Sequence, residues 1–280
     1  MSGFDPHWLA LREPADHAAR DKRLLALVAD RFAARQQVDV VDLGAGAGSN
    51  LRALAPHLPA RQSWTLVDHD PALLDTARRA LLAWAEEGRE AEGGVVLDKS
   101  GKRVTVAFRQ ADLARDIDDL LMPAPDLVTA AALFDLVSEP WLRRFTAALV
   151  ERGAPLYAVL TYDGLERWSP PHRLDEAVLS AFHLHQQRDK GFGPAAGPRA
   201  AGALAASLVK LGYSVRNGDS PWQLGAAQAA LVGELASGIA QAAVETGRLS
   251  RVEAEAWVAA RRQATAVEIG HRDLWAEKAA

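Results

Sequence analysis

The chain has no cysteine among its 280 residues. This absence excludes disulfide bonds, thiolate zinc sites and a cysteine nucleophile. The chain also lacks an apolar run long enough to span a membrane. Its N-terminal segment carries Asp5, Arg12, Glu13 and Asp16 within a Trp/Leu pattern, which is not the pattern of a signal peptide. We therefore expect a cytoplasmic protein that does not associate with a membrane.

A surplus of positive charge is missing as well. The 32 Lys and Arg residues are outnumbered by 36 Asp and Glu residues, which gives a formal net charge of −4. General nucleic-acid binders carry a basic surplus, so no nucleic-acid partner is expected. The length fits one large α/β domain, and the hydrophobic fraction of 49% supplies its core.

The most informative segment is residues 40–50, which read Val-Val-Asp-Leu-Gly-Ala-Gly-Ala-Gly-Ser-Asn. The apolar start predicts a buried strand. The three alternate glycines that follow predict a sharp turn whose backbone can come close to a ligand. The helix expected after the turn directs its free N–H groups at that ligand. The segment therefore predicts a site for a nucleotide-type ligand.

Strand and helix patterns alternate along most of the chain. This alternation favours a doubly wound, mostly parallel sheet with helices on both faces. A hairpin insert is expected around Ser100-Gly101 after a polar loop at 88–94, and the tail at 265–275 is expected to supply a last edge strand. Helices are predicted at 14–36, 49–57, 71–87, 139–151, 174–187 and 200–211, with two more within 226–260; strands are predicted at 38–43, 64–67, 104–109, 126–130, 155–162 and 213–216.

We expect one domain made of four parts. An N-terminal helical cap (1–36) precedes a cofactor-binding core (37–162), a substrate-lid insert (163–199) and a C-terminal part that completes the sheet (200–280). The insert is rich in Pro, Gly, His and aromatic residues, and such loops on a rigid scaffold tend to carry specificity. The Ala-rich helices of the C-terminal part are compatible with packing against a second copy of the chain as a homodimer.

Two ligands compete for the glycine turn. A dinucleotide fingerprint, Gly-x-Gly-x-x-Gly, requires glycine where this chain has Ser49. The spacing here is Gly-x-Gly-x-Gly, preceded by Asp42. In this respect the chain resembles the class I S-adenosylmethionine-dependent methyltransferases, over about residues 38–162. The resemblance implies S-adenosyl-L-methionine as the cofactor and a seven-stranded Rossmann-like sheet.

Acidic residues follow the second and third expected strands. Asp68 lies 20 residues after Gly48, where a carboxylate can accept both ribose hydroxyls, and both ligands require it. The resemblance implies that Asp112 accepts a hydrogen bond from the adenine amino group and that the N–H of Leu113 reaches the ring. Dehydrogenases do not need Asp112, so it discriminates best between the two ligands. Taken alone, Asp112 would be a surface acid.

Other implied cofactor contacts have alternative interpretations. Asp42 contacts the cofactor or only orders the turn, Asn50 contacts it or caps the first helix, and His69 stacks on adenine or is exposed. Arg20, like Arg12, holds a carboxylate or forms a salt bridge on its own helix. The full implied set of cofactor contacts is Arg20, Asp42, Gly44, Ala45, Gly46, Gly48, Asn50, Asp68, His69, Asp112, Leu113 and Ala130.

Asp135 is the first candidate for contact with the acceptor. The resemblance implies that it faces the methyl group, together with Phe134. His172 is the candidate general base, because imidazole titrates near neutral pH. Asp163 and His185 are alternatives to it. His183 and His185 are two residues apart and would point to different sides of a helix, so a metal site there is not favoured and no metal is expected.

These features predict transfer of a methyl group from S-adenosylmethionine to an O or N nucleophile of a small molecule. The family's amino-methylating enzymes often carry an Asn/Asp-Pro-Pro-Tyr type motif, and residues 126–135 contain none. Methylation of a protein or an RNA remains an alternative. Two others are a methyltransferase-like interaction module without activity and an NAD-dependent oxidoreductase.

Overall fold

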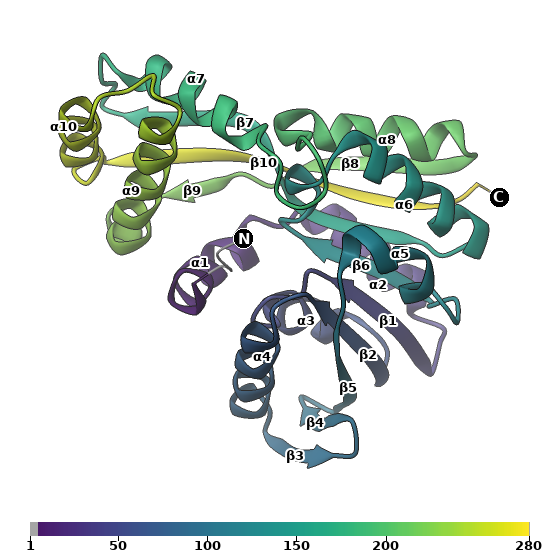
Figure 1. The fold of residues 1–280 in the computed structure, drawn as a ribbon. Coiled ribbons are helices and arrows are strands. Elements are labelled where there is room, and N and C mark those ends of the chain that lie inside the picture. Colours follow the sequence, from purple (N-terminus) through teal and green to yellow (C-terminus); the bar gives the residue numbers. More distant parts are fainter. Residues whose placement is uncertain (1–4, 280) are drawn as a thin grey trace.

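One continuous β-sheet organises the protein in the computed structural model, which describes residues 5–279 (Figure 1). The first residues of the predicted cap, 1–4, lie outside the described part. Within the described residues the sheet has ten strands in the order β3-β4-β5-β2-β1-β6-β7-β10-β8, and β9 pairs with β10. The strands are β1 (Gln37–Leu43), β2 (Arg61–Asp68), β3 (Glu87–Ala91), β4 (Gly94–Lys99), β5 (Lys102–Gln110), β6 (Leu127–Ala131), β7 (Leu156–Ser169), β8 (Tyr213–Asp219), β9 (Trp222–Leu224) and β10 (Ala266–Lys278).

The sheet is mixed, which corrects the predicted seven-stranded, mostly parallel arrangement. Its centre is parallel: β1 pairs with β2 and β6, β2 pairs with β5, and β6 pairs with β7. The flanks are antiparallel, because β3 and β4 form a hairpin beside β5, and β10 runs against β7, β8 and β9. The strand–helix alternation of the sequence accounts for the centre only, since hairpin strands have no helix between them.

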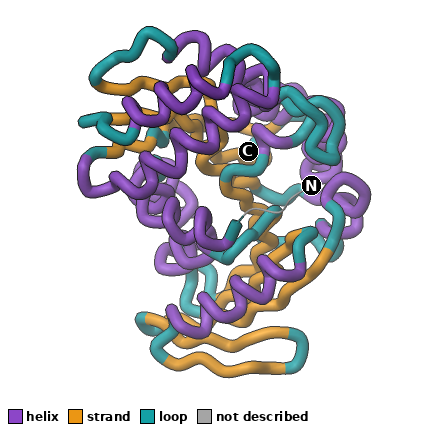
Figure 2. The backbone as a smooth tube through the Cα atoms, turned by 60° about the vertical axis from the view of Figure 1, so that its left-hand side comes forward, coloured by secondary structure: helices purple, strands orange, loops and turns teal. Residues whose placement is uncertain are grey.

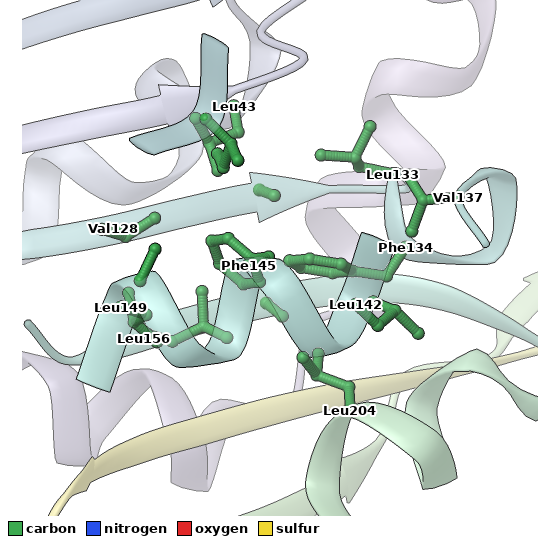
Figure 3. Packing of buried hydrophobic residues seen from close by; sticks show 14 of the residues in the cluster. Leu43, Val128, Leu133, Phe134, Val137, Leu142, Phe145, Leu149, Leu156 and Leu204 are labelled. Carbon is green, nitrogen blue, oxygen red and sulfur yellow. The ribbon is translucent and has the colours of Figure 1, made fainter. Parts of the chain in front are cut away.

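Helices cover both faces of the sheet, as predicted. One face carries α5 (Leu113–Leu120), α6 (Glu139–Arg152) and α8 (Ala200–Lys210). Figure 3 shows this layer, where Phe145 of α6 lies toward Val128 of β6 and Leu142 of the same helix lies near Leu204 of α8. The other face carries α2 (Lys22–Phe32), α3 (Ser49–Leu54) and α4 (Pro71–Trp84). No helix within residues 5–279 has the length and apolar character needed to cross a membrane.

A second helical layer forms on the extended ends of β7 and β10. It contains α7 (Asp175–Gln186), α9 (Ala229–Glu245) and α10 (Arg251–Arg261), and its buried core includes Trp168 and Trp257. These helices lie at the end of the molecule opposite the β3–β4 hairpin (Figures 1 and 2). Helix α1 (Pro6–Ala19) lies between this layer and the central sheet. The short 3₁₀ helices are η1 (Ala55–His57), η2 (Phe134–Leu136), η3 (Gly197–Arg199) and η4 (Ala226–Gln228).

The single N-terminal helix predicted at 14–36 is wrong, because two helices form there. Asp5 caps α1, and Pro14 lies inside that helix instead of opening one. The chain breaks after α1 because Asp21 caps α2 with its carboxylate, which accepts the N–H groups of Arg23 and Leu24. Proline at 14 therefore marked a helix interior and not a helix start.

Two expectations about strands also need correction. The tail forms β10, but β10 is an inner strand between β7 and β8, not an edge strand. The polar loop expected at 88–94 is largely strand β3, whose residues are mostly exposed. The hairpin turn at Ser100-Gly101 is confirmed, and both residues have positive φ. Local patterns missed β3 because an exposed hairpin strand has no alternating apolar face.

Candidate functional site

The glycine turn lies where the parallel strands β1 and β2 end. Gly44, Gly46 and Gly48 all have positive φ, at 66°, 52° and 75°. This conformation is costly for residues with a Cβ. A Cβ on Gly44 would also lie 3.2 Å from Leu133 Cδ1, so the turn fits closely against the end of β6. The N–H of Ala45 donates to Val67 O at 2.9 Å, which fixes the turn beside β2.

Asp68 ends β2 and faces this turn. Its Oδ2 accepts the N–H of Gly46 at 2.8 Å, and its Oδ1 accepts the N–H of Asp70 at 3.0 Å. The residue is 5% exposed. A carboxylate has about four acceptor positions, so these two bonds leave capacity for further donors such as hydroxyl groups. The structure therefore brings the predicted ribose-binding carboxylate to the glycine turn.

A buried polar cluster lies beneath the turn. Asn50 Nδ2 donates to Asp42 Oδ1 at 2.7 Å and to Thr129 Oγ1 at 3.1 Å. Arg20 Nη2 donates to Asn50 Oδ1 at 2.9 Å. Burial raises the pKa of Asp42 to about 7, although the hydrogen bond from Asn50 and the charge of Arg20 act in the opposite direction. The structure therefore brings Arg20, Asp42 and Asn50, three of the implied cofactor contacts, together in one buried cluster.

The cluster keeps unused hydrogen-bonding atoms. Asp42 Oδ2 and the Nε and Nη1 atoms of Arg20 are buried and have no hydrogen-bond partner among the described residues. Such atoms are costly to bury unless a ligand or water pairs with them. A guanidinium with two free nitrogens fits a carboxylate, and a carboxyl oxygen fits an ammonium group. The amino-acid part of S-adenosylmethionine carries both groups, so the residues present fit this cofactor.

Helix α1 covers the glycine turn. Glu13 accepts two hydrogen bonds from Arg52, from Nε at 2.7 Å and from Nη2 at 2.5 Å, and Arg52 Nη1 donates to Ala47 O at 3.0 Å. His17 Nε2 lies 3.0 Å from Ser49 Oγ. Arg12, a candidate carboxylate holder, pairs with Asp16 on the same helix, which is the alternative that the sequence left open.

The predicted adenine contacts lie at the ends of β2 and β5. His69 is half exposed, with Nδ1 3.3 Å from Asp68 Oδ1. Asp112 caps α5 by accepting the N–H of Ala114, and it also pairs with Arg115. Its side chain is 41% exposed, so it remains accessible to another donor. Leu113 is buried as the first residue of α5. The side chain of Ala130, another implied cofactor contact, is fully buried in β6. Strand β6 ends one residue later, at Ala131.

Asp135 follows β6 in η2 and is 8% exposed. Its Oδ1 is buried and finds no hydrogen-bond partner in the described part of the chain. Burial raises the pKa of Asp135 to about 6, while the backbone of Tyr162 and the charges of Arg12 and Lys190 lower it. An ionised carboxyl oxygen without a partner can accept a proton or orient a donor at this position. The structure thus gives Asp135, the first candidate residue, a buried oxygen whose hydrogen-bonding capacity is unused among the described residues.

The structure does not bring His172, the candidate base of the insert, to Asp135, and the two alternatives are engaged in ion pairs. His172 follows the far end of β7, about 20 Å along the strand from Tyr162 at about 3.3 Å per residue. Its Nδ1 accepts the N–H of Leu174 at 3.3 Å. Asp163 pairs with Arg272, and His185 pairs with Glu245.

Sequence reasoning missed the residues that do surround Tyr162. Glu166 and His183 bond to its hydroxyl group, and His271 packs near its ring. The even spacing of residues 162, 166 and 168, which places them on one face of a strand, was the available signal. It was missed because the predicted strand ended at residue 162. The fold therefore replaces His172 with a different set of titratable groups.

Comparisons with known proteins bear on the fold. No protein-family model matches the chain, and no curated protein sequence matches it either. The cyclopropane synthase MmaA2 from Mycobacterium tuberculosis is similar in structure with a TM-score of 0.53, at 10% identity over 98% of this chain and 95% of that one. The YcgJ protein from Bacillus subtilis has a TM-score of 0.50, at 14% identity over 93% of this chain and 100% of that one. A putative methyltransferase from Bacillus halodurans also has a TM-score of 0.50, at 12% identity over 91% of this chain and 99% of that one.

The chain has the class I S-adenosylmethionine-dependent methyltransferase fold. At these identities the similarity establishes the fold and nothing about the substrate. Within this fold Asp68 is the last residue of β2, and the glycine turn and Asp135 follow β1 and β6, so all three lie at the carboxyl edge of the parallel strands. Ligands of open α/β sheets bind at that edge.

Proposed function

We propose that this protein is an enzyme that transfers the methyl group of S-adenosylmethionine to an O or N nucleophile of a small molecule. The observation that carries the proposal is the meeting of Asp68 with the glycine turn, next to the unpartnered atoms of Arg20 and Asp42. The ribose hydroxyls of the cofactor need a carboxylate acceptor such as Asp68, and its amino-acid part needs a cation and an acceptor such as Arg20 and Asp42. These groups all lie near the end of β1.

The proposed contacts follow from chemistry at each position. Asp68 accepts the ribose hydroxyls, His69 and Asp112 border the adenine, and Arg20 with Asn50 holds the amino-acid part. A sulfonium cofactor supplies a methyl group already activated for displacement, so the protein mainly orients and desolvates the reactants. Asp135 then faces the acceptor through its free Oδ1.

A small-molecule acceptor is favoured because other parts of the chain cover the sheet edge at the glycine turn. Helix α1 lies over the glycine turn, and residues of α1 pack against the second helical layer, so the chain itself covers part of this edge. The net charge of −4 gives no general attraction for a polymer of phosphates. A methyltransferase-like module without activity is the second candidate, and the extended α9–α10 pair is the feature that favours it.

Calorimetry with S-adenosylhomocysteine tests the proposal. We expect the wild-type protein to bind at submillimolar ligand and Asp68→Asn to bind at least tenfold more weakly, since one charged hydrogen-bond acceptor is worth about 1.5–3 kcal/mol. Asp70→Asn is the matched control, because Asp70 is the next acid along the chain and only caps α4. Absence of binding to the wild-type protein would contradict the proposal.

A further inference from the structure

A chain of three titratable side chains leads away from the candidate site through Tyr162. The Tyr162 hydroxyl donates to Glu166 Oε1 at 3.0 Å and lies 3.1 Å from His183 Nε2. The indole N–H of Trp168 donates to the other Glu166 oxygen at 3.3 Å. The chain thus joins β7 to α7, inside the second helical layer.

The position of Tyr162 connects this chain to the proposed reaction. Tyr162 comes three residues after Val159, the last β7 residue that pairs with β6, so it lies just beyond the sheet edge that holds the glycine turn. Its backbone lies close enough to the Asp135 carboxyl group to lower the pKa of that group. One residue therefore borders the acceptor-facing carboxylate with its backbone and begins the chain with its side chain.

The phenol can act as a relay between its two neighbours. Tyr162 has one proton to donate and can accept in addition. It donates to an ionised Glu166 while it accepts from His183, or it donates to His183 while it accepts from a protonated Glu166. The chain can therefore carry a proton between its ends without moving a heavy atom.

The two ends of the chain differ in exposure. Burial raises the pKa of Glu166 to about 7, and burial lowers the pKa of His183. His183 lines a surface cleft of about 480 Å³ together with Ser180 and Gln187, so a proton on its ring can pass to solvent. The acidic groups that face the chain from the packed elements are Asp135, Asp163 and Asp175, and the ring of His271 lies beside Tyr162. The cationic group near its buried end is Arg261, which lies over Trp168 and pairs with Asp175. Glu176 and Arg248 line the cleft at His183.

We propose that Tyr162, Glu166 and His183 form a proton relay for the acceptor and that the acceptor presents a hydroxyl group. This inference rests on the proposed methyl transfer. The acceptor oxygen forms its bond to the methyl carbon as the carbon–sulfur bond breaks, and that bonding pair stays on sulfur. The acceptor O–H bond breaks, its proton passes to the Tyr162 oxygen, and the Tyr162 proton passes to Glu166. The proton on Glu166 then returns to the Tyr162 oxygen as the Tyr162 proton passes to His183, and His183 releases it to water in the cleft.

A hydroxyl group, unlike a neutral amine, is a nucleophile that needs a proton relay. It attacks well only as it loses its proton, so a proton acceptor beside it accelerates the step by roughly 10²–10⁴-fold. A neutral amine already has a free electron pair when it attacks. Tyr162 is the catalytic residue in this scheme, while Glu166 and His183 act through it as positioning residues.

The first test needs no cofactor and uses NMR titration of the His183 ring in the full-length protein. We expect Glu166→Gln to move the His183 titration to lower pH, because the anion that stabilises its protonated ring is removed. Tyr162→Phe should abolish the effect of Glu166→Gln. The control is Glu176→Gln, since Glu176 lines the same cleft as His183. An unchanged His183 titration in Glu166→Gln, or an equal shift in Glu176→Gln, would overturn the relay.

The second test measures which atom receives the methyl group. The protein is incubated with isotope-labelled S-adenosylmethionine and the small-molecule fraction of a cell lysate, and products are identified by mass spectrometry. We expect an O-methyl product whose formation falls roughly 100-fold in Tyr162→Phe and in Glu166→Gln, with unchanged binding of S-adenosylhomocysteine. An N-methyl or C-methyl product, or no labelled product, would overturn the hydroxyl assignment. Failure of the wild-type protein to bind S-adenosylhomocysteine would instead reject the proposed function, while the NMR result would still report on the relay.

Discussion

Single residues at the glycine turn combine backbone strain with close packing. Gly44 and Gly153 have the same φ of 66°, but only Gly44 has a neighbour within contact distance of an added Cβ. Alanine variants at these two positions therefore separate the cost of a side chain at positive φ from the cost of placing a methyl group against Leu133. Asp42 and Asp68 lie near the ends of the neighbouring strands β1 and β2, yet Asp42 is buried in a polar cluster and Asp68 remains able to accept further hydrogen bonds.

We expect Gly44→Ala to weaken binding of S-adenosylhomocysteine by at least tenfold, because the added methyl group displaces Leu133 and the turn. Both variants should lower the free energy of unfolding by about 1 kcal/mol, because both place a side chain at positive φ. Gly153→Ala should leave the affinity for the ligand unchanged. Calorimetry and thermal unfolding of both variants measure the two effects. Equal affinities in the two variants would show that the turn is not at the ligand.

His271 makes the stability of the protein sensitive to acid. Burial lowers the pKa of this side chain to about 3, so the native state holds it neutral while the unfolded chain binds a proton below about 6.5. The unfolded state therefore gains more protons as the pH falls through this window, and stability is lost there by roughly 1.4 kcal/mol per pH unit at most. We expect His271→Gln to reduce this slope in denaturant titrations. The exposed His7→Gln serves as control, and an equal slope in wild type and His271→Gln would contradict the account.

Among the elements, α1 is joined to α3 beside the glycine turn by a bidentate ion pair, in addition to the contact of His17 with Ser49. The Glu13–Arg52 pair is bidentate, with Arg52 only 9% exposed. We expect Glu13→Ala to speed hydrogen exchange in α1 and to weaken S-adenosylhomocysteine binding several-fold. The Asp98–Arg103 pair is also bidentate but far more exposed, so Asp98→Ala should change neither quantity. Unchanged exchange in Glu13→Ala would mean that packing alone holds α1.

The elements also mark what the sequence could predict. The strand ending in Asp42-Leu43, the glycine turn and the helices at the centre carry local signals, and the structure confirms them. The course of β7 to Ser169 could not be read locally, because Asp163-Gly164 resembles the start of a loop. Its pairing with residues 266–271 comes from contacts about a hundred residues apart in the chain. The relay residues were missed for the same reason.

At the scale of the whole molecule, Asp273 joins three distant segments. Its Oδ1 accepts the N–H of Leu160 at 2.8 Å and its Oδ2 accepts the N–H of Asp21 at 2.9 Å. Leu160 has a φ of 58°, and the β10–β7 register shifts beside Asp273. The carboxylate thus supports the point where β7 and β10 leave the central sheet for the second helical layer.

We expect Asp273→Ala to lower the free energy of unfolding by about 2–5 kcal/mol, because two buried N–H groups lose their acceptor. Asp219→Ala is the control, since Asp219 is 71% exposed and pairs with Arg272 on the surface. Urea denaturation of both variants provides the comparison. A loss below about 1 kcal/mol in Asp273→Ala would show that the junction is held by apolar packing.

The topology of the molecule was predicted in its centre and missed at its flanks. Alternation of strands with helices fixes a parallel centre with helices on both faces, and that part is confirmed. The insertion of the C-terminal strand between β7 and β8 leaves no local pattern, so the tail seemed to form an edge. The candidate residues around the glycine turn could be grouped from the sequence because they follow neighbouring strands of that centre.

The central claim is that the edge at the glycine turn binds S-adenosylmethionine. The most direct measurement is a crystal structure of the protein with S-adenosylhomocysteine. We predict that the ribose hydroxyls bond to Asp68, that the amino-acid part lies against Arg20 and Asn50, and that the sulfur faces Asp135. A ligand bound anywhere else, or this edge closed to the ligand at saturating concentration, would contradict the account.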